Sequence, residues 1–363
     1  MKEYLLKEIA NVKNGYAFDS SKYSDKGIPI IRIADIKDNI DLSKCVCIDE
    51  KINKEFLIKK GSLLIALSGA TTGKMSVFSD NKIAYLNQRI CSIYTKNEDI
   101  SQEFLIYFLK SIQKKIIVNS YGGAQPNISS KWIENIKIKV PNIEIQKKIS
   151  KKLELLANSI NSRKSQLVFL KELTKSLFTK YSIGEKESIA NLCYVKARIG
   201  WQGLTKKEYL SNGEYYLITG VDFKNEKIDF KNCFYVTKER YNQDENIKVK
   251  INDILLTKDG TIGKVAIVDK LEKPATLNSG VFVLRPKVNN LNVTYLMHSL
   301  ISEDFKKFID DIKIGATVPH LNQAALLKYK LILPPIELQN KFAERIEKIE
   351  KLKFEIEKSI EIA

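Results

Sequence analysis

The chain contains few of the residues from which catalytic and metal sites are usually built. Its two histidines, His298 and His320, lie apart, with no cysteine placed beside them. Its five cysteines are scattered and form no Cys-x-x-Cys pair. Zinc sites and catalytic triads need a precise set of such groups brought together, and nothing here indicates one. An odd, dispersed set of cysteines also argues against a disulfide framework, so we interpret them as reduced thiols of a cytoplasmic protein.

Long apolar segments are also lacking. Charged residues interrupt the sequence every few positions from Met1 onward. No window approaches the roughly 20 apolar residues that a membrane helix requires. The sequence therefore predicts a protein that does not enter a membrane.

Motifs for phosphate binding and methyl transfer are incomplete. The segment from Ser68 to Lys74 resembles a phosphate-binding loop, but that loop needs glycine at its first position and Ser or Thr where Met75 follows the lysine. A Pro-Pro pair at 334–335 would suit the catalytic loop of an amino-methyltransferase, yet Leu333 before it has no group to hold a target amine. The sequence predicts no catalytic residues.

Positive charge is present in excess. Lys and Arg number 60 against 43 Asp and Glu, which gives a net charge of +17. Such an excess most simply serves to bind a polyanion, and nucleic acid is the leading candidate. A lysine-rich proteome in which every protein surface is basic would give the same balance. Charge alone does not separate these explanations.

The sequence repeats itself once. Ile138–Gln146 and Leu331–Gln339 each contain an apolar run that stops at proline and is followed directly by a charged, helix-like segment. Proline fixes φ and has no N–H, so it ends a strand and can open a helix. Further matched pairs keep the same order, which indicates a duplication. These pairs are Ile9–Val12 with Ile189–Leu192, Leu64–Lys74 with Ile254–Lys264, and Gly122–Ile128 with Gly315–Leu321.

The pattern of apolar residues in each half of the sequence predicts short strands followed by a long helix. Apolar runs bounded by Gly, Asn, Asp and Ser are typical of strands, and shorter helices are expected near 104–117 and 293–309. The segments after the prolines place apolar residues at alternating steps of four and three, as in a coiled coil. Residues 145–180 contain nine basic and two acidic residues, whereas 337–363 contain six basic and seven acidic ones. This charge difference favours pairing between the two helices.

These patterns predict an α+β fold with two tandem domains related by a pseudo-two-fold axis. A long helix follows each domain, and the two helices pair as an antiparallel coiled coil. The expected boundaries are 1–143 for the first domain, 144–181 for its helix, 182–335 for the second domain and 336–363 for the last helix.

The duplicated layout, the Gly-Lys turns and the Pro-x-Ile-Glu-x-Gln joints together resemble the specificity subunit of type I restriction-modification systems. The resemblance covers essentially the whole chain. It implies that both domains are target recognition domains, each binding one part of a split, asymmetric DNA sequence. The helices would act as a spacer and as the docking surface for two methyltransferase subunits.

The resemblance also implies where the chemistry takes place. Methyl transfer from S-adenosylmethionine and cleavage driven by ATP and Mg²⁺ would belong to the methyltransferase subunits and to restriction–translocase subunits. The chain itself is then expected to be non-catalytic and to hold no cofactor or metal.

Direct recognition of bases needs Arg, Lys, Asn and Gln on loops that face the DNA grooves. Polar side chains near the repeated turns are the candidates. In the first domain they are Lys13, Arg32, Lys37, Lys74, Gln88 and Arg89, and in the second Lys196, Arg198, Lys224, Lys258 and Lys264. Arg32 and Arg89 have a structural role as an alternative, because each adjoins an apolar run. Trp132 is expected in the core, whereas Trp201 either contacts DNA or caps its domain.

Two other functions fit the same sequence. One is DNA recognition within a methylation-only or another defence system, which would differ only in its partners. The other is a tandem module that binds protein and no nucleic acid.

Overall fold

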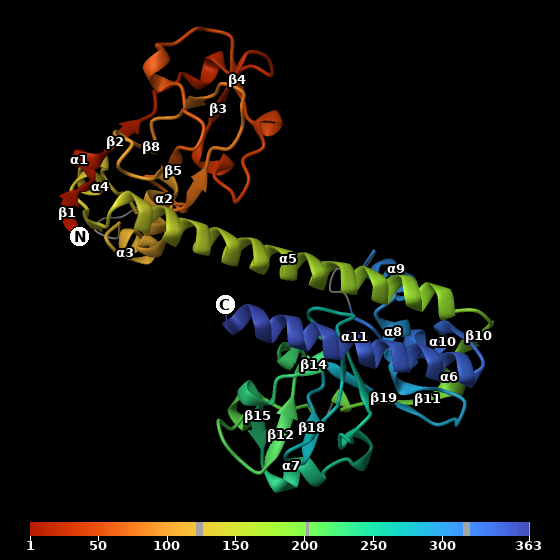
Figure 1. Cartoon of the computed structure of the whole chain (residues 1–363). Coiled ribbons are helices and arrows are strands. Elements are labelled where there is room, and N and C mark those ends of the chain that lie inside the picture. The colour runs from red at the N-terminus through yellow and green to blue at the C-terminus, as the bar shows by residue number, and fades with distance from the viewer. Residues whose placement is uncertain (121–125, 201–202, 315–319, 363) are drawn as a thin grey trace. The chain divides into compact units, whose positions relative to one another are not determined.

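The computed structural model describes residues 1–120, 126–200, 203–314 and 320–362 (Figure 1). The chain divides into two compact units, Met1–Asn161 and Ser162–Ala363. Helix α5 (Ile143–Tyr181) contributes its first part to unit 1 and its remainder to unit 2. No helix of the described residues has the length and apolar character needed to cross a membrane.

Unit 1 is a mixed α/β unit whose two ends pair with each other. Strand β1 (Lys2–Leu5) runs antiparallel to β9 (Lys137–Val140), the strand that precedes α5. The main sheet is antiparallel and has the order β2 (Ala10–Asn14), β8 (Ile90–Thr95), β5 (Leu63–Ala66) and β6 (Met75–Val77). A smaller sheet has the order β4 (Cys47–Ile48), β3 (Ile28–Ile31) and β7 (Tyr85–Leu86). The helices are α1 (Leu6–Ile9), α2 (Gln102–Ser111), α3 (Gln113–Val118) and α4 (Ser130–Glu134).

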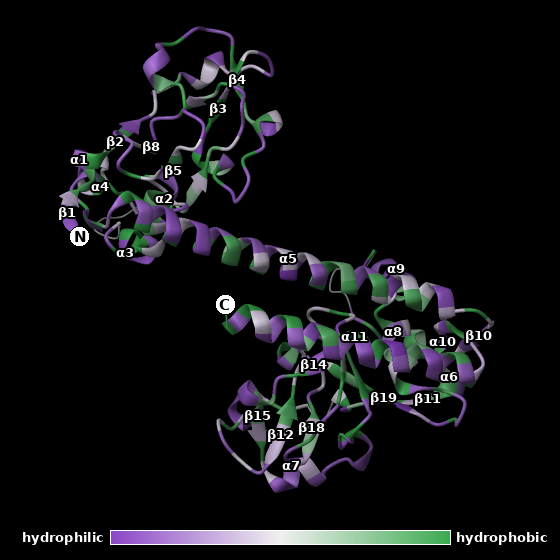
Figure 2. Ribbon diagram, in the orientation of Figure 1, coloured by the Kyte–Doolittle hydropathy of each residue, from purple (hydrophilic) through white to green (hydrophobic). Residues whose placement is uncertain are grey.

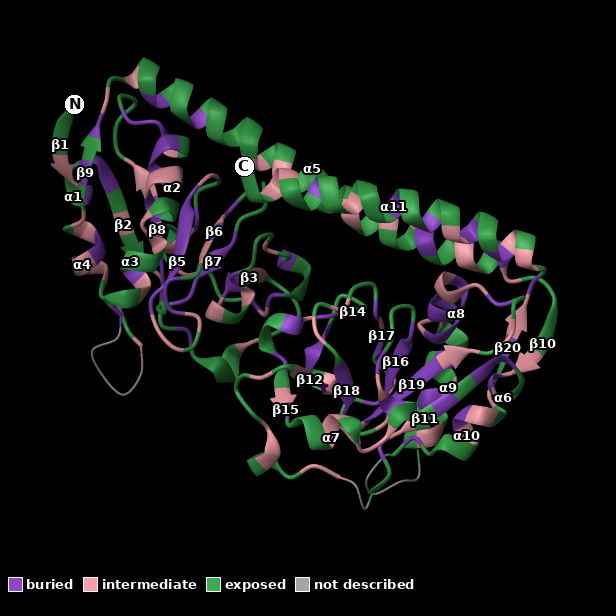
Figure 3. Cartoon of the chain, turned by 90° about the horizontal axis from the view of Figure 1, so that it is seen from below, coloured by how far each residue is buried: buried purple, intermediate pink, exposed green. Residues whose placement is uncertain are grey.

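The main sheet of unit 1 separates two cores. Ile65 and Ile93 point to one face and pack with residues of α2, α3 and α4. Leu64 and Ile90 point to the other face and pack with Ile31 of the smaller sheet. Successive residues of a strand face opposite sides of a sheet, so the all-apolar run of β5 is buried on both sides. Figure 3 shows this strand as buried.

Unit 2 repeats this plan with a wider main sheet. Strand β10 (Glu185–Ser188) pairs antiparallel with β20 (Lys330–Leu333). The main sheet has the order β11 (Cys193–Ala197), β19 (Val281–Pro286), β16 (Ile254–Thr257), β17 (Val265–Ile267), β14 (Lys227–Ile228) and β13 (Phe223–Lys224). The smaller sheet has the order β15 (Phe234–Val236), β12 (Tyr215–Ile218) and β18 (Ala275–Leu277). The helices after α5 are α6 (Ile189–Leu192), α7 (Lys238–Asn242), α8 (Val293–Leu300), α9 (Glu303–Lys313), α10 (Gln323–Lys328) and α11 (Ile336–Ile362).

The shorter helices expected in each half are present as broken pairs. Residues 104–117 fall on α2 and α3, and 293–309 fall on α8 and α9. The expectation for Trp132 was wrong, because its indole is half-buried at the edge of the core and not within it. Trp132 lies on α4, a helix of five residues, and a large ring on so short a surface helix covers the core without entering it.

The repeated segments correspond at offsets that differ from the sequence match. The match of Ile9–Val12 with Ile189–Leu192 was wrong by three residues, because α6 is the counterpart of α1, Leu6–Ile9. In the main sheet the difference is one residue. Leu63 of β5 lies opposite Ile93, as Ile254 of β16 lies opposite Leu284. Leu63, and not Leu64, is therefore the counterpart of Ile254. The turn that follows is one residue longer in unit 1, which restores the match at the Gly-Lys pair.

Within unit 2, the last part of α5 packs against α11. The ring of Phe178 lies 5.8 Å from that of Phe342, and the ring of Tyr181 lies 6.1 Å from it. Leu170, Leu173 and Leu177 pack on the same core, which contains Ile346 and Ile349 of α11. Figure 2 shows that hydrophilic and hydrophobic residues alternate along both helices. The apolar stripe of α11 is therefore buried within its own unit.

Replacing Phe342 with alanine should destabilise the protein by about 3–5 kcal/mol, because the ring is 0% exposed and packs on three aromatic rings and His298. The matched control is Phe354→Ala on the same helix, where the ring is 67% exposed and the change should stay within about 0.5 kcal/mol. Urea unfolding of both variants measures the difference. Equal losses in the two variants would contradict the packing described above.

Candidate DNA interface

In unit 1, three loops meet at one end of the main sheet. They follow β3, connect β7 to β8, and connect β5 to β6. Asn87 N–H donates to Ile31 O at 3.1 Å, and Leu67 N–H donates to Arg89 O at 2.8 Å. These backbone bonds bring together predicted residues from separate parts of the sequence. The residues are Arg32, Lys74, Gln88 and Arg89.

The side chains at this end differ in how firmly they are held. Gln88, Arg89 and Lys74 are exposed. Arg32 is half-buried, with its Nε 3.4 Å from Asp35 Oδ2 and its guanidinium 5.9 Å from the ring of Tyr23. Arg32 therefore has a structural partner, although part of its side chain still reaches the surface.

Two further candidates of unit 1 lie close by on exposed backbone. Lys13 is on β2, opposite Ser92, on the face of the sheet turned away from the α2–α4 core. Lys37 follows a short 3-10 helix that begins one residue after Arg32. Both side chains are exposed.

In unit 2, the corresponding loops are joined by the same backbone bonds. Asn278 N–H donates to Ile218 O at 2.9 Å, and Lys258 N–H donates to Gly280 O at 2.9 Å. The Lys258 side chain is half-buried, and its ammonium group lies 5.4 Å from the ring of Phe282. The neighbouring positions present Thr219, Asp259, Ser279 and His320, and the His320 ring contacts the Asp259 carboxylate.

The two units thus share a backbone frame that carries different side chains. Asn87 and Asn278 each accept, through Oδ1, the N–H of the residue two positions later, at 3.2 and 2.9 Å. Within this shared geometry, Gln88 corresponds to Ser279, and Arg89 corresponds to Gly280. The first unit offers hydrogen-bond donors on long side chains where the second offers a hydroxyl and a bare backbone.

Arg198 was wrongly predicted as a DNA-binding residue. Its side chain is 2% exposed, and its guanidinium donates to Leu277 O at 2.8 Å, Gln243 Oε1 at 3.1 Å and Thr276 Oγ1 at 3.1 Å. Burial lowers the pKa of Arg198 from its ordinary value. A buried cation that is paired in this way fastens β18 to the segment after β11 and does not face a ligand.

The remaining candidates of unit 2 are spread over its surface. Lys196 is exposed on β11, at the position that matches Lys13 on β2. Lys224 on β13 forms an ion pair with Asp229. Lys264 is exposed beside the cleft described below. The structure therefore brings Lys258 and Lys264 to the end of the sheet where the loops meet, because they begin and end the turn between β16 and β17.

Some predicted features lie outside the described residues. Trp201 is one of them, and so are residues 122–125 and 315–319 of the two matched glycine-containing segments. Their described ends do correspond, because Ile128 N–H donates to Leu67 O at 2.8 Å and Leu321 N–H donates to Lys258 O at 3.0 Å.

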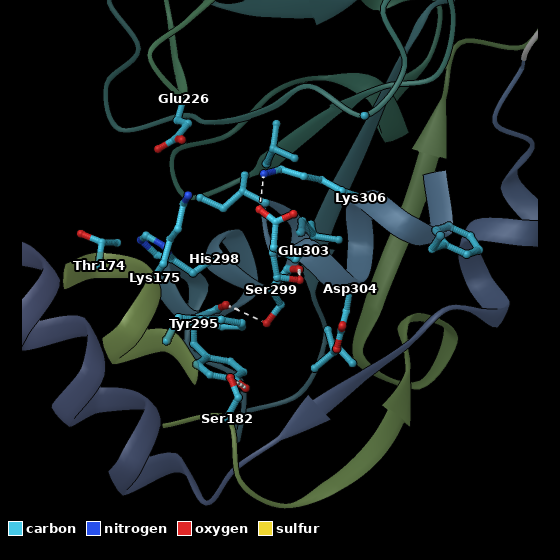
Figure 4. A pocket seen from close by; sticks show the side chains of 18 of the residues that line it. Thr174, Lys175, Ser182, Glu226, Tyr295, His298, Ser299, Glu303, Asp304 and Lys306 are labelled. Atoms are coloured by element: carbon cyan, nitrogen blue, oxygen red, sulfur yellow. Dashed lines mark hydrogen bonds and ion pairs between the residues drawn. The ribbon is translucent and has the colours of Figure 1, made fainter. Parts of the chain in front are cut away.

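A cleft of about 980 Å³ lies in unit 2 between α5, α8, α9 and α11. Figure 4 shows its lining, in which Lys306 is paired with Glu303 at 2.7 Å. Tyr295 donates its O–H to Ile332 O at 2.8 Å. Burial lowers the pKa of His298 to about 4, so this imidazole is neutral near pH 7. These polar groups support the packing of the helices around the cleft.

Thiol and metal chemistry find no support among the described residues. All five cysteines are buried, and burial raises the pKa of Cys91 and of Cys193 to about 12. A protonated thiol is a poor nucleophile. No group of three or more His, Cys, Asp or Glu side chains in the described part of the chain is placed to hold a metal ion.

Comparisons with known proteins agree on one family. A family model for the type I restriction modification DNA specificity domain matches residues 1–168 and 199–363. The type I restriction enzyme MjaVIII specificity subunit of Methanocaldococcus jannaschii is 28% identical over 326 residues, which cover 83% of this chain and 75% of that protein. The EcoBI specificity subunit of Escherichia coli is 23% identical over 392 residues, which cover 97% and 80%.

Solved structures show the same fold. The S subunit of a type I restriction-modification system from M. genitalium aligns with a TM-score of 0.59 at 16% identity, over 99% of this chain and 92% of that one. A chain from a structure that describes assembly and conformational transition of the type I R-M system aligns with a TM-score of 0.62 at 14% identity, over 99% and 93%. The mixed α/β fold of the two units is therefore a known one.

His298 should make the protein less stable in mild acid. The pKa of an unfolded histidine is 6.5 and that of buried His298 is about 4, so the unfolded chain takes up the proton first as the pH falls. The stability that this histidine contributes above pH 6.5 is lost as the pH falls toward 4. Between pH 7 and pH 5, wild type should lose about 2 kcal/mol more than His298→Gln in urea unfolding. Parallel losses in the two proteins would contradict this assignment.

Proposed function

Because the chain belongs to the type I restriction-modification DNA specificity family, we propose that it is the sequence-specific DNA-binding subunit of a type I restriction-modification complex. Residues 1–143 and 182–335 act as target recognition domains, and each binds one part of a split, asymmetric DNA sequence. The observation that carries the proposal is the shared backbone frame with different side chains on it.

Different side chains on one frame favour an asymmetric target. Two identical recognition surfaces related by a two-fold axis would bind a palindrome. Arg89 in the first domain can donate two hydrogen bonds to guanine, whereas Gly280 at the matching position has no side chain to do so. Arg32 and Gln88 add further base-contacting groups to the first domain, and Lys258 to the second.

Side chains common to both units suit contacts that carry no sequence information. Lys13 matches Lys196 on the first strand of each main sheet, and Lys74 matches Lys264 after the repeated turn. All four are exposed. Lysine neutralises backbone phosphates irrespective of sequence, so these lysines would hold the DNA while other residues recognise bases. Lys37 and Lys224 follow corresponding 3-10 helices, Ile33–Asp35 and Gly220–Asp222, and would add one basic group to each unit, although Lys224 is paired with Asp229.

The long helices, 144–181 and 336–363, form the spacer as an antiparallel coiled coil. The ring contacts of Phe178 and Tyr181 with Phe342 support this pairing at the C-terminal end of α5, within unit 2. Helix α5 has 39 residues and is roughly 58 Å long at ~1.5 Å per residue. It exceeds one DNA turn of ~34 Å, so it is long enough to separate two half-sites on one side of the duplex.

The outer surface of these helices is the docking site for the partner subunits. Phe169 and Phe354 are each 67% exposed, which is unusual for rings on the surface of a helix unless a partner covers them. Two methyltransferase subunits and restriction–translocase subunits would bind here and supply the S-adenosylmethionine, ATP and Mg²⁺ chemistry. The chain itself would be non-catalytic and would work in the cytoplasm.

Mapping methylated adenines in cells that express the complex should reveal a two-part, asymmetric motif with a fixed gap. Arg89→Ala should relax the specificity at one base pair in one half of the motif, because binding to the base preferred by the wild type should weaken by about 1–3 kcal/mol. Arg163→Ala, an exposed arginine on α5, is the matched control and should change neither half. A contiguous or palindromic motif would overturn the two-domain proposal.

Removing the lysines after the repeated turns should weaken DNA binding uniformly across sequences. The affinity of a DNA-binding protein falls with salt, so the slope of log affinity against log salt is negative. Lys74→Ala combined with Lys264→Ala should reduce the magnitude of this slope by about 2, because two phosphate contacts are lost. The control is Lys148→Ala with Lys341→Ala, which removes two exposed lysines from the long helices. Titrations at several salt concentrations measure the slopes. An unchanged slope in the first variant would exclude these phosphate contacts.

A further inference from the structure

Each long helix begins with a buried glutamine. Gln146 is 1% exposed and Gln339 is 0% exposed, and both lie in the first turns of helices whose charged residues are mostly exposed. Both belong to the repeated Pro-x-Ile-Glu-x-Gln segment. Glu144 and Glu337 of that segment are exposed, so the buried group at each joint is the amide and not the carboxylate.

In unit 1, the amide of Gln146 pairs with three backbone groups from two segments. Its Nε2 donates to Asp99 O and to Pro141 O, both at 2.9 Å. Its Oε1 accepts the N–H of Ser101 at 2.9 Å. Ser101 caps α2, and Pro141 lies between the end of β9 and the start of α5. One side chain therefore fastens the start of α5 to the recognition domain.

In unit 2, Gln339 makes the same three bonds. Its Nε2 donates to Asn290 O at 3.0 Å and to Pro334 O at 2.7 Å, and its Oε1 accepts the N–H of Asn292 at 2.9 Å. Asn292 caps α8, as Ser101 caps α2. The arrangement needs two donors and one acceptor at this reach, and glutamine is suited to it because glutamate has no donor and asparagine is one methylene shorter.

A small change of angle at this joint has a large effect at the far end of the helix. A helix of 39 residues is roughly 58 Å long, so tilting it by about 3° moves its far end by ~3 Å. That displacement is close to the ~3.4 Å rise of one base pair. A spacer that selects one gap length therefore needs a stiff joint at each recognition domain.

We infer that Gln146 and Gln339 are positioning residues that fix the direction in which each long helix leaves its recognition domain. In this way they restrict the complex to one gap length between the half-sites. The inference rests on the proposed function, because it assumes a split target. It assigns no base contact to either glutamine.

The test uses Gln146→Met and Gln339→Met, each purified with the methyltransferase subunits. Methionine has nearly the same size but cannot pair the three backbone groups. Methylation rates are measured on duplexes that keep both half-sites and change the gap by one or two base pairs. Wild type should prefer one gap. The quantity compared is the methylation rate on a duplex whose gap differs by one base pair, divided by the rate on the natural gap. Each variant should raise this ratio by about tenfold over wild type, equivalent to ~1.4 kcal/mol. The bases of both half-sites should stay the same.

Gln102→Met is the matched control, because the amide of Gln102 also pairs with three backbone groups, Gly61 O, Ile93 O and Thr95 N–H, but with none on α5, and it should keep the wild-type gap preference. Should a methionine variant fail to fold, Gln146→Asn and Gln339→Asn retain an amide of shorter reach and enter the same assay. Folded variants with the wild-type gap profile would overturn the inference and leave the proposed function standing. A wild-type complex that methylates a contiguous motif would instead overturn the proposed function.

Discussion

The proposed spacing role of the long helices depends on pairing the backbone groups at the point where each helix meets its domain. The chain enters each helix through proline, which has no N–H to donate at the joint. Buried carbonyl and N–H groups left unpaired at this point would each cost about 1–3 kcal/mol. The amides of Gln146 and Gln339 pair them, and the same bonds connect each helix to the cap of a domain helix.

In each domain, the backbone hydrogen bonds that hold the loops are distinct from the side chains that the loops expose. Backbone bonds such as Leu67 N–H to Arg89 O recur in the other unit as Lys258 N–H to Gly280 O. These bonds depend little on side-chain identity. Residues at the loop ends are therefore free to differ without disturbing the sheets, which suits two domains that recognise different sequences on one scaffold.

The sequence predicts those features that depend on local pattern and repetition. The proline joints, the long helices and the order of matched segments are visible in the residues themselves. Arg198 shows the limit of such inference. Its buried partners Leu277 and Thr276 are far away in the sequence, so no local pattern indicates that this arginine is buried. Gln146 was overlooked for the same reason, since Asp99 and Ser101 are brought to it only by the fold. The one-residue shift at Leu63 is detectable only from strand pairing.

The repeated Gly-Lys turns connect the proposed phosphate contacts to the core. Gly73 and Gly263 have φ of +80° and +88°, a conformation that favours glycine. An added Cβ would lie 2.5 Å from Ile117 in unit 1 and 3.2 Å from Ile309 in unit 2. Helices α3 and α9 therefore pack directly against these turns and fix the backbone position of Lys74 and Lys264. The backbone of both lysines is held by the turn geometry that the two units share, whereas the side chain of Arg89 is exposed. The proposed division of DNA contacts into shared phosphate contacts and domain-specific base contacts agrees with this difference, because the core restrains the turns of the two lysines more than the side chain of Arg89.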